Sequence, residues 1–537
     1  MSEPFDVVVV GGGHNGLVAA GLLAKRGARV TVLERRNAVG GAATTEQPWG
    51  PDFKMSSLSY VVSLIPAAIL QELELARYGY QVYPQNGYFV PYRDGRSLQL
   101  PDNDPARCRA QIAQFSEADA DAYPRWDAWL GGLGRVLGPL LETIAPALGS
   151  LRPGDLFDQA RFAWTLRRLG VSGVGDVTRL FTSSIADLLD DWFTSPQMQG
   201  VLSVSGVIGV WAGPRSPGTA YVMAHHKVGD AGEGELGTWG FPAGGMGGVS
   251  EALRAAAIAN GAVVRTSAPV ARIDVSNGRA RGVTLESGEE IRADVVIAAT
   301  HPKITFLDQI DRALLPYDFV AAIERWKSRS GTVKVNVAVD RLPEFTAKPG
   351  FDPEVHGGTI VLAESLDDIE GAFQDAVAGR AAALPFADIC IPSVFDPTLA
   401  PEGKHVVSMF TQWVPHRWAS TADEAGLAAY ADRVIARVEE VAPGFTDSIL
   451  NRQVIGPYEM EHEYGLIGGN IFHGELSPDQ LFHMRPAPGY ADFRTPIDGL
   501  YQASSATHGG GGVTGIPGLN ATRQIMRDRS RSRWRRG

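Results

Sequence analysis

The chain opens with a regular alternation of short apolar runs and an amphipathic stretch. An apolar run at positions 7–10 is followed by three glycines. Apolar residues then recur every three or four positions to about residue 25, and a second apolar run at 30–33 ends in Glu34. Short apolar runs are typical of buried strands, and a period near 3.6 is typical of a helix. The pattern predicts a strand, a tight turn, a helix and a second strand.

The glycines of this turn have the spacing of a dinucleotide-binding βαβ unit. Gly11 permits the tight turn, Gly13 lets the backbone approach a pyrophosphate, and Gly16 lets the helix pack close to the strand. The helix N-terminus supplies amide donors and a partial positive charge to the phosphates. Glu34 is placed to accept hydrogen bonds from both hydroxyls of an adenosine ribose. We expect a dinucleotide cofactor at this turn.

A second glycine pair, Gly40–Gly41, follows the ribose acid. An extended cofactor needs a second stretch of bare backbone beside its diphosphate and ribityl chain, whereas NAD sites do not. The pair therefore favours FAD over NAD.

The pattern changes several times further along the chain. Residues 103–240 show helical spacing with glycine and proline breaks, and a glycine-rich turn near residue 241 precedes a helix expected at 249–260. A hairpin-like run at 280–291 leads into a strand that ends at Thr300, and alternating runs at 332–339 and 405–414 suit an antiparallel sheet. The chain then returns to a strand, a polyglycine turn and a last helix at 516–528, whose N-terminus could face the flavin.

The length of 537 residues exceeds what one core supports, so we expect more than one domain. The fold class is α/β: a discontinuous, Rossmann-like FAD-binding domain of the glutathione-reductase type, and a substrate domain with an antiparallel sheet and a helical region. The expected segments are 1–102, 241–310 and 491–528 for FAD binding, 103–240 for a helical lid, 311–490 for the substrate domain, and 529–537 for a basic tail.

Composition narrows the class of partner. The net charge of −11 argues against nucleic acid, which usually requires a basic face. Cys108 and Cys390 are isolated, which excludes a CxxC redox pair. The first strand begins too soon after Met1 for a cleavable leader, and no apolar stretch is long enough to span a bilayer. We expect a cytoplasmic protein.

Several motifs are together specific for one group of flavoenzymes: GGGHNGL, LERRNAVGGAATTE, FKMSSLSYVVSL, AYVMAHHKVG, GTWGFPAGGMGGVSEAL, GGNIFHGELSPDQLFHMRP and GLYQASSATHGGGGVTG. With these motifs the chain resembles the phytoene-desaturase-like branch of FAD-dependent oxidoreductases, and most closely the family of pyridine nucleotide-disulphide oxidoreductase domain-containing protein 2. The resemblance implies the fold and the FAD. It does not imply phytoene as the substrate, because Ala42 and Ser56 stand where the carotenoid desaturases usually have Arg and Asp.

The family name implies a pyridine nucleotide, but a second dinucleotide fingerprint is missing from the sequence. GGMGGV at 244–249 follows no apolar strand and is interpreted as a turn of the flavin domain. NAD(P)H is therefore not expected as a tightly held cosubstrate.

The expected site draws on both ends of the chain. His508, in the polyglycine turn, and His473, in the GGNIFHGE loop, are the candidate catalytic residues, with a structural role open for each. Six aromatic residues at 192–241 could line a chamber or belong to the core. No metal site is predicted. The predicted cofactor-binding residues are Gly11, Gly13, Asn15, Gly16, Glu34, Arg35, Gly40, Gly41, Ala42, Val270, Thr300, Ser505, Gly512 and Val513.

The expected reaction is hydride transfer from a hydrophobic unsaturated substrate, isoprenoid, polyene or lipid-like, to flavin N5, giving desaturation or double-bond isomerisation. Two alternatives stay open: an amine oxidase-type flavoenzyme, and a flavin-binding interaction protein with little turnover. The last eleven residues, 527–537, carry six arginines and Trp534, which suits peripheral contact with an anionic membrane or a solvated end. The sequence leaves the oligomeric state open.

Overall fold

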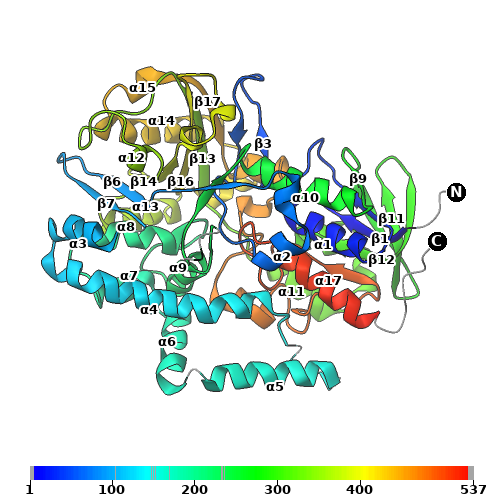
Figure 1. The fold of residues 1–537 in the computed structure, drawn as a ribbon. Helices are drawn as coiled ribbons and strands as arrows, with labels where there is room; N and C mark the ends of the chain where they lie inside the picture. Colours follow the sequence, from blue (N-terminus) through cyan, green and yellow to red (C-terminus); the bar gives the residue numbers. More distant parts are fainter. Residues whose placement is uncertain are drawn as a thin grey trace.

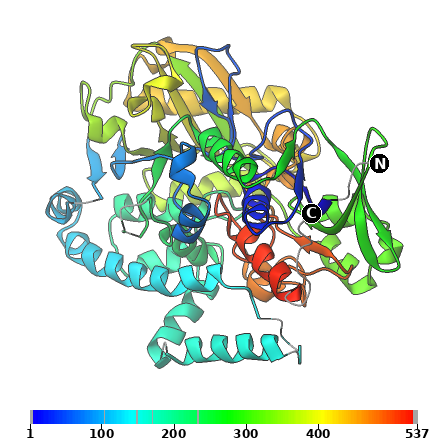
Figure 2. The same cartoon turned by 45° about the vertical axis from the view of Figure 1, so that its right-hand side comes forward.

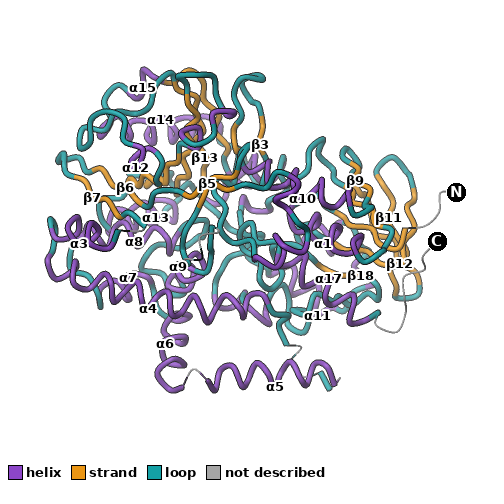
Figure 3. The backbone as a smooth tube through the Cα atoms, in the orientation of Figure 1, coloured by secondary structure: helices purple, strands orange, loops and turns teal. Residues whose placement is uncertain are grey.

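The computed structural model describes residues 5–529 except positions 103, 147, 149, 152, 169, 232, 233 and 235. Two seven-stranded sheets lie side by side, and long helices run beneath them (Figures 1 and 3). The structure confirms an α/β fold with a mixed sheet and a mainly antiparallel sheet. No helix in the described residues is both long and apolar enough to cross a membrane.

The first sheet has a parallel part in the order β18–β12–β1–β2–β9, assembled from distant segments of the chain. Every residue of β1 from Val7 to Val10 is buried, as expected for a parallel strand covered on both faces. The bounds are β1 (Phe5–Val10), β2 (Val30–Leu33), β9 (Val263–Arg265), β12 (Glu290–Ala298) and β18 (Leu500–Gln502).

An antiparallel extension and three helices complete this lobe. Strands β10 (Val270–Ser276) and β11 (Arg279–Leu285) pair with the first part of β12. Helices α1 (His14–Lys25), α10 (Met246–Ala259) and α17 (Ile516–Asp528) pack together against the parallel strands. The predicted last helix is confirmed at both ends. The helix expected at 249–260 begins three residues earlier, because Gly245 already caps it.

The second sheet has the order β17–β13–β16–β15–β14–β6–β7. Its two alternating runs are confirmed as strands, although β16 ends at Gln412 rather than at 414. The structure puts β6 and β7 in this sheet, whereas the sequence grouped residues 1–102 with the FAD-binding domain, because β14 pairs with β6 and not with the first lobe. The bounds are β6 (Tyr88–Pro91), β7 (Ser97–Leu100), β13 (Thr332–Val339), β14 (Thr359–Leu362), β15 (Phe386–Cys390), β16 (His405–Gln412) and β17 (Ile449–Ile455).

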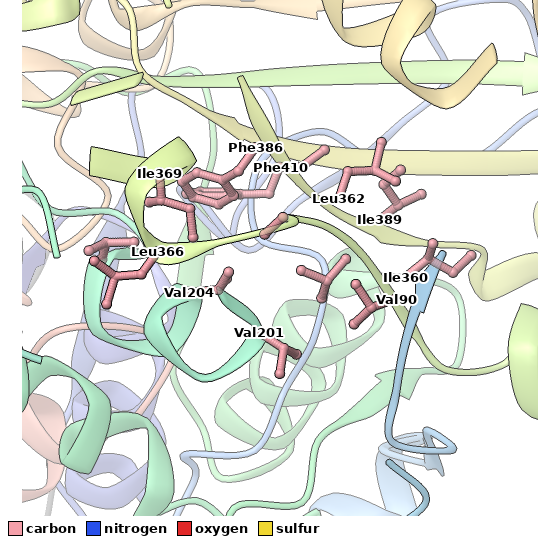
Figure 4. Close-up of a cluster of buried hydrophobic side chains, with 14 of the residues drawn as sticks. Val90, Val201, Val204, Ile360, Leu362, Leu366, Ile369, Phe386, Ile389 and Phe410 are labelled. Atoms are coloured by element: carbon pink, nitrogen blue, oxygen red, sulfur yellow. The ribbon is translucent and has the colours of Figure 1, made fainter. Parts of the chain in front are cut away.

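The core of the second lobe lies between this sheet and helices that cover it. Figure 4 shows Val201 and Val204 facing Ile360, Ile389 and other apolar side chains of the strands. Helix α14 (Glu424–Val441) lies across the upper part of the lobe in Figure 1. The remaining elements are β3 (Thr45–Glu46), β4 (Met55–Ser56), β5 (Val82–Pro84), β8 (Gly240–Pro242), α2 (Ala67–Glu72), α11 (Tyr317–Arg325), α12 (Pro353–His356), α13 (Leu366–Val377), α15 (Phe445–Ser448) and α16 (Pro457–His462).

The segment 103–240 is mainly helical, as predicted. Helices α5 and α6 project from the body as an arm that both views show (Figures 1 and 2). On α5, Phe157 and Trp164 are 68% and 53% exposed in the described part of the chain. The helices are α3 (Pro105–Ala113), α4 (Glu117–Glu142), α5 (Pro153–Arg168), α6 (Gly170–Thr182), α7 (Ile185–Asp190), α8 (Pro196–Val207) and α9 (Thr219–Lys227).

Candidate active site

A cavity of about 470 Å³ lies between the two sheets. The ends of β1, β2 and β12 form one side of it, and β13, β15 and β16 form the opposite side. Ligands of open α/β sheets bind outside the carboxyl ends of the strands, and the volume lies within the range of small-molecule sites. This cavity is the candidate active site.

The first glycine turn forms one wall of the cavity. Gly11 has φ +103°, a conformation that favours glycine. A Cβ at Gly16 would lie 2.2 Å from the Gly11 carbonyl oxygen, so Gly16 is required for packing of α1 on β1. A Cβ at Gly13 would have no atom nearer than 4.0 Å and would enter the cavity. The fold therefore leaves open space at Gly13, next to the N-terminus of α1.

Glu34 is positioned by two backbone amides at the end of β2. The amides of Gly12 and Arg36 donate to its two carboxylate oxygens at 2.7 and 2.9 Å. A Cβ at Gly12 would lie 2.9 Å from the Glu34 Cβ, so Gly12 must be glycine for the acid to approach the turn. The sequence analysis missed Gly12, although the run of three glycines was the available signal.

The second glycine pair lies against the first turn. The Gly40 amide donates to the Gly12 carbonyl at 2.9 Å, and both Gly40 and Gly41 have positive φ. A Cβ at Gly40 would lie 2.2 Å from the Ala43 carbonyl oxygen, which excludes larger residues. Both glycines and Ala42 line the cavity, so the pair lengthens its bare backbone surface.

The C-terminal polyglycine turn completes this side of the cavity. We call the two N-terminal glycine turns, Glu34 and this C-terminal turn together the cofactor cradle. Asn15 Nδ2 donates to Ser505 Oγ at 3.0 Å, which joins the two ends of the chain. A Cβ at Gly518 would lie 2.2 Å from the Asn15 carbonyl oxygen, so α17 packs closely on the start of α1. Gly512 and Val513 line the cavity just before α17 begins.

The structure brings the predicted cofactor residues together. Every one of them lines the cavity except Gly16, which lies beneath the turn. Arg35 lines it while donating to the Glu463 carbonyl at 2.9 Å, and Val270 and Thr300 line it from the β10 and β12 side.

The two candidate catalytic histidines differ in position. His473 lines the cavity with φ +58°, and its Nδ1 has no hydrogen-bond partner among the described residues. Burial, and then the nearby His14 and Arg485, lower the pKa of His473 to about 3. His508 does not line the cavity; its Nε2 donates to the Leu140 carbonyl at 3.0 Å. Of the two, the structure brings only His473 to the cavity.

Three further histidines line the cavity and were not predicted as site residues from the sequence: His14, His226 and His301. Burial lowers the pKa of His14 to about 4, and its Nε2 has no hydrogen-bond partner in the described structure. His301 donates from Nε2 to Ser328 Oγ at 3.0 Å, and its ring lies 5.6 Å from that of His473. His14 directly follows the glycine turn, which was the available signal.

Among the polar residues on the opposite side of the cavity, Tyr60, Lys334 and Asp388 form a cluster that we call the polar floor. Pairing of β13, β16 and β15 puts Lys334, Phe410 and Asp388 in one row across the sheet. Directly paired residues of an antiparallel sheet project from the same face. Lys334 Nζ donates to Ser408 Oγ and lies 4.2 Å from the centre of the Tyr60 ring. The Tyr60 hydroxyl hydrogen-bonds Asp388.

Burial controls the charges of the polar floor. It lowers the pKa of Lys334 to about 7, against the opposing effect of Cys390 and Asp388. Burial also raises the pKa of Asp388 to about 7, against the opposing effects of Lys334 and Tyr60.

The walls around the polar floor are largely apolar. Of the six aromatic residues considered in the sequence, Trp239 lines the cavity. Phe193, Tyr221 and Phe241 are buried core residues. The apolar lining next to the polar floor includes Leu58, Val62, Ile208, Trp239, Ile471 and Phe472.

Comparison with known proteins identifies the family. The family model for flavin containing amine oxidoreductases matches residues 16–518. The chain belongs to this family. It is 40% identical to the rat pyridine nucleotide-disulfide oxidoreductase domain-containing protein 2, over 98% of this chain and 94% of that protein. It is also 26% identical to one of the polypeptides of the limonene dehydrogenase of Castellaniella defragrans, over 98% of this chain and 96% of that polypeptide.

Among solved structures, an oxidoreductase from Methanosarcina mazei has a similar fold. The TM-score is 0.58 at 18% identity, and the match covers 97% of this chain and 100% of that one. These comparisons confirm the resemblance drawn from the sequence motifs and the flavin cofactor, FAD. The protein is an FAD-containing oxidoreductase.

The residues of the cradle fit FAD. The open space at Gly13 suits a diphosphate, and Glu34 is placed to receive ribose hydroxyls. Two buried polar atoms that have no hydrogen-bond partner among the described residues, His14 Nε2 and Asn15 Oδ1, belong to residues that line the cavity. A buried polar group is normally hydrogen-bonded, so these atoms are available to the cofactor.

The glycine-rich turn at 244–249, before α10, does not belong to the cofactor cradle. At the start of α10, the Met246 amide donates to Ser56 Oγ at 3.0 Å and the Gly247 amide donates to Thr45 Oγ1 at 2.8 Å. A helix N-terminus binds phosphate through such free amides. The protein's own hydroxyls occupy these donors, so this turn joins α10 to the β3–β4 hairpin.

Proposed function

We propose that this flavoenzyme removes a hydride from, or relocates a double bond in, an apolar unsaturated substrate of the isoprenoid or lipid class. One observation carries the proposal: the cofactor cradle and an apolar chamber form a single cavity. Ile208, Trp239 and Phe472 supply walls that contact a hydrocarbon chain and exclude water. The name of limonene dehydrogenase, a relative of 26% identity, supports an isoprenoid substrate.

The chain contributes binding and proton handling, while bound FAD supplies the two-electron acceptor. His473 is the candidate proton acceptor, because its ring lines the cavity and its Nδ1 is without a partner in the described structure. With its pKa near 3, the ring is neutral at pH 7. We assign His508 to support of the polyglycine turn through Leu140.

An amine oxidase is the second candidate, favoured by the family model that matches the chain. The apolar walls argue against a cationic amine, because the amine would lose its hydration on entering the chamber. A flavin-binding protein with little turnover is the third candidate. The apolar lining that continues beyond the predicted cofactor residues, including Ile208, Trp239 and Phe472, supports a substrate in the same cavity.

The test is reduction of the purified holoenzyme under anaerobic conditions, measured as loss of flavin absorbance. The holoenzyme is mixed either with an extract of isoprenoids and lipids or with the amines putrescine and cyclohexylamine. The extract should bleach the flavin, and mass spectrometry should find a product altered by two hydrogens or by a shifted double bond. Ile208→Trp, which fills the chamber, should slow bleaching by roughly tenfold or more, while Leu450→Trp on exposed β17 should not. Bleaching by the amines alone would establish the second candidate, and bleaching by neither would favour the third.

Two finer assignments belong to this proposal. The β10–β12 extension beside five parallel strands supports a cofactor domain of the glutathione-reductase type. We also propose peripheral contact with an anionic membrane through the arginine-rich tail at 529–537, of which residues 530–537 lie outside the described structure. Exposed Phe157 and Trp164 on the α5–α6 arm suit a membrane interface.

Deleting residues 530–537 should weaken sedimentation with phosphatidylglycerol vesicles at low salt, and added salt should weaken that of the intact protein. Phe157→Ser together with Trp164→Ser tests the arm separately. Equal sedimentation of all three proteins would remove the membrane from the proposal.

A further inference from the structure

The polar floor is not explained by an apolar substrate alone. Lys334 is only 1% exposed, although a buried ammonium is costly unless it is paired and hydrogen-bonded. Its position in β13 alternates with Val333 and Val335, which face the other side of the sheet. A valine at this position would suit the apolar walls better, so packing against an apolar substrate does not explain why a lysine is buried here.

The hydrogen bonds of Lys334 are incomplete. Among the described residues its Nζ donates to one oxygen, Ser408 Oγ, and a second side of the group lies over the Tyr60 ring. An ammonium has three donors, and a neutral amine has two. In either protonation state the side chain retains a donor for a ligand in the cavity.

Asp388 and Tyr60 limit the kind of ligand group that fits. A cationic ligand group would be repelled by Lys334, and an anionic ligand group would be repelled by Asp388. Either group would also lose its hydration on entering the cavity. A neutral oxygen avoids both costs. A pure hydrocarbon would displace water from the amine and return no hydrogen bond.

We propose that the polar floor binds the one oxygen-bearing group, a hydroxyl or a carbonyl, of an otherwise apolar substrate. Lys334 donates to this oxygen, while Ser408 and the Tyr60 ring hold the amine in place and Asp388 attracts it electrostatically. The inference rests on the proposed function and specifies the substrate class within it. It places the polar end of the substrate at the second sheet, opposite the cofactor cradle.

The test compares two ligands with the same C15 isoprenoid body, farnesol and β-farnesene. Each is titrated into the oxidised holoenzyme, and binding is followed by perturbation of the flavin absorbance, so that no turnover is needed. Farnesol should bind at least about tenfold more tightly, as expected for one hydrogen bond to a charged group. Lys334→Met should abolish this preference and leave binding of β-farnesene in place. Lys404→Met, the same change at an exposed site, should keep the preference.

The outcomes separate the inference from the proposed function. Equal binding of both ligands to the wild type overturns the inference and leaves an apolar substrate standing. A preference that survives Lys334→Met also overturns it. Binding of neither ligand overturns both. If Lys334→Met does not fold, Tyr60→Phe keeps the ring, removes the hydroxyl that holds Asp388, and should reduce the preference.

Discussion

Gly13 and Gly16 lie three positions apart in one turn and are glycines for different physical reasons. Gly16 is fixed by the fold, because a side chain there would collide with the Gly11 carbonyl and with Val9. The fold leaves Gly13 unconstrained, because only the cavity lies beyond it, and its predicted role is to admit the cofactor. The sequence predicted the packing role of Gly16, which the structure confirms, because the fingerprint encodes backbone conformation and packing. The cofactor role of Gly13 stays a prediction.

This difference predicts opposite effects of the same small change. Gly13→Ala should leave the thermal unfolding midpoint of the FAD-free protein unchanged and weaken FAD binding by about tenfold or more, because the methyl group occupies space meant for the ligand. Gly16→Ala should lower that midpoint by itself. Gly371→Ala, on an open face of α13, is the matched control. FAD affinity of Gly13→Ala equal to that of the control would show that the diphosphate lies elsewhere.

Lys334 of the polar floor is a residue whose place in the site could not be predicted from the sequence. The strand 332–339 was predicted, but its lysine was not selected, because a lone lysine in a strand usually faces solvent. Only the register with β16 and β15 puts it in one row with Asp388. Register between segments more than fifty residues apart is not contained in local periodicity.

At the scale of elements, the two glycine-rich turns before α1 and α10 look alike in sequence. They differ in whether the backbone amides at the start of the helix are already hydrogen-bonded by the protein. The turn before α1 faces the cavity, whereas Thr45 and Ser56 occupy the amides at the start of α10. The hairpin that supplies these hydroxyls lies two hundred positions earlier. The lack of a preceding apolar strand at 244–249 was the signal that separated the two turns.

This arrangement predicts slow reduction by NADH and NADPH, because the α10 terminus has no free amides for a second dinucleotide and FAD occupies the first site. Stopped-flow absorbance of the flavin is the measurement. Thr45→Ala frees the Gly247 amide and should not create rapid reduction, since the backbone of Thr45 still lies 2.7 Å from where a Cβ on Gly247 would be. Reduction within milliseconds at micromolar nucleotide would contradict the prediction.

At the scale of the whole molecule, buried histidines couple stability to pH. Burial lowers the pKa of His14 and His508 to about 4, and of His225 and His473 to about 3. An unfolded histidine has a pKa near 6.5. Between these values the unfolded chain binds more protons than the folded one, so the stabilisation is complete above about pH 6.5 and is lost as the pH falls toward 4.

The thermal unfolding midpoint should therefore fall steadily from pH 7 to pH 5. Each of these histidines contributes up to roughly 1.4 kcal/mol per pH unit to the slope of unfolding free energy. His508→Gln should make the dependence shallower, and His462→Gln, at an exposed position, should not. A midpoint independent of pH over this interval would show that these rings are protonated in the folded state.

The cofactor lobe joins segments from the two ends of the sequence, which contact each other in the folded protein. Asn15 and Ser505, which hydrogen-bond each other, are 490 positions apart. At ribosomal rates of about 5 to 20 residues per second, roughly 25 to 100 s separate the synthesis of the two residues. During that time α1 has no α17 to cover it, and its buried alanines and leucines are exposed to other chains. We therefore expect this face of α1 to be covered, and the walls of the cavity to be complete, only after α17 has left the ribosome.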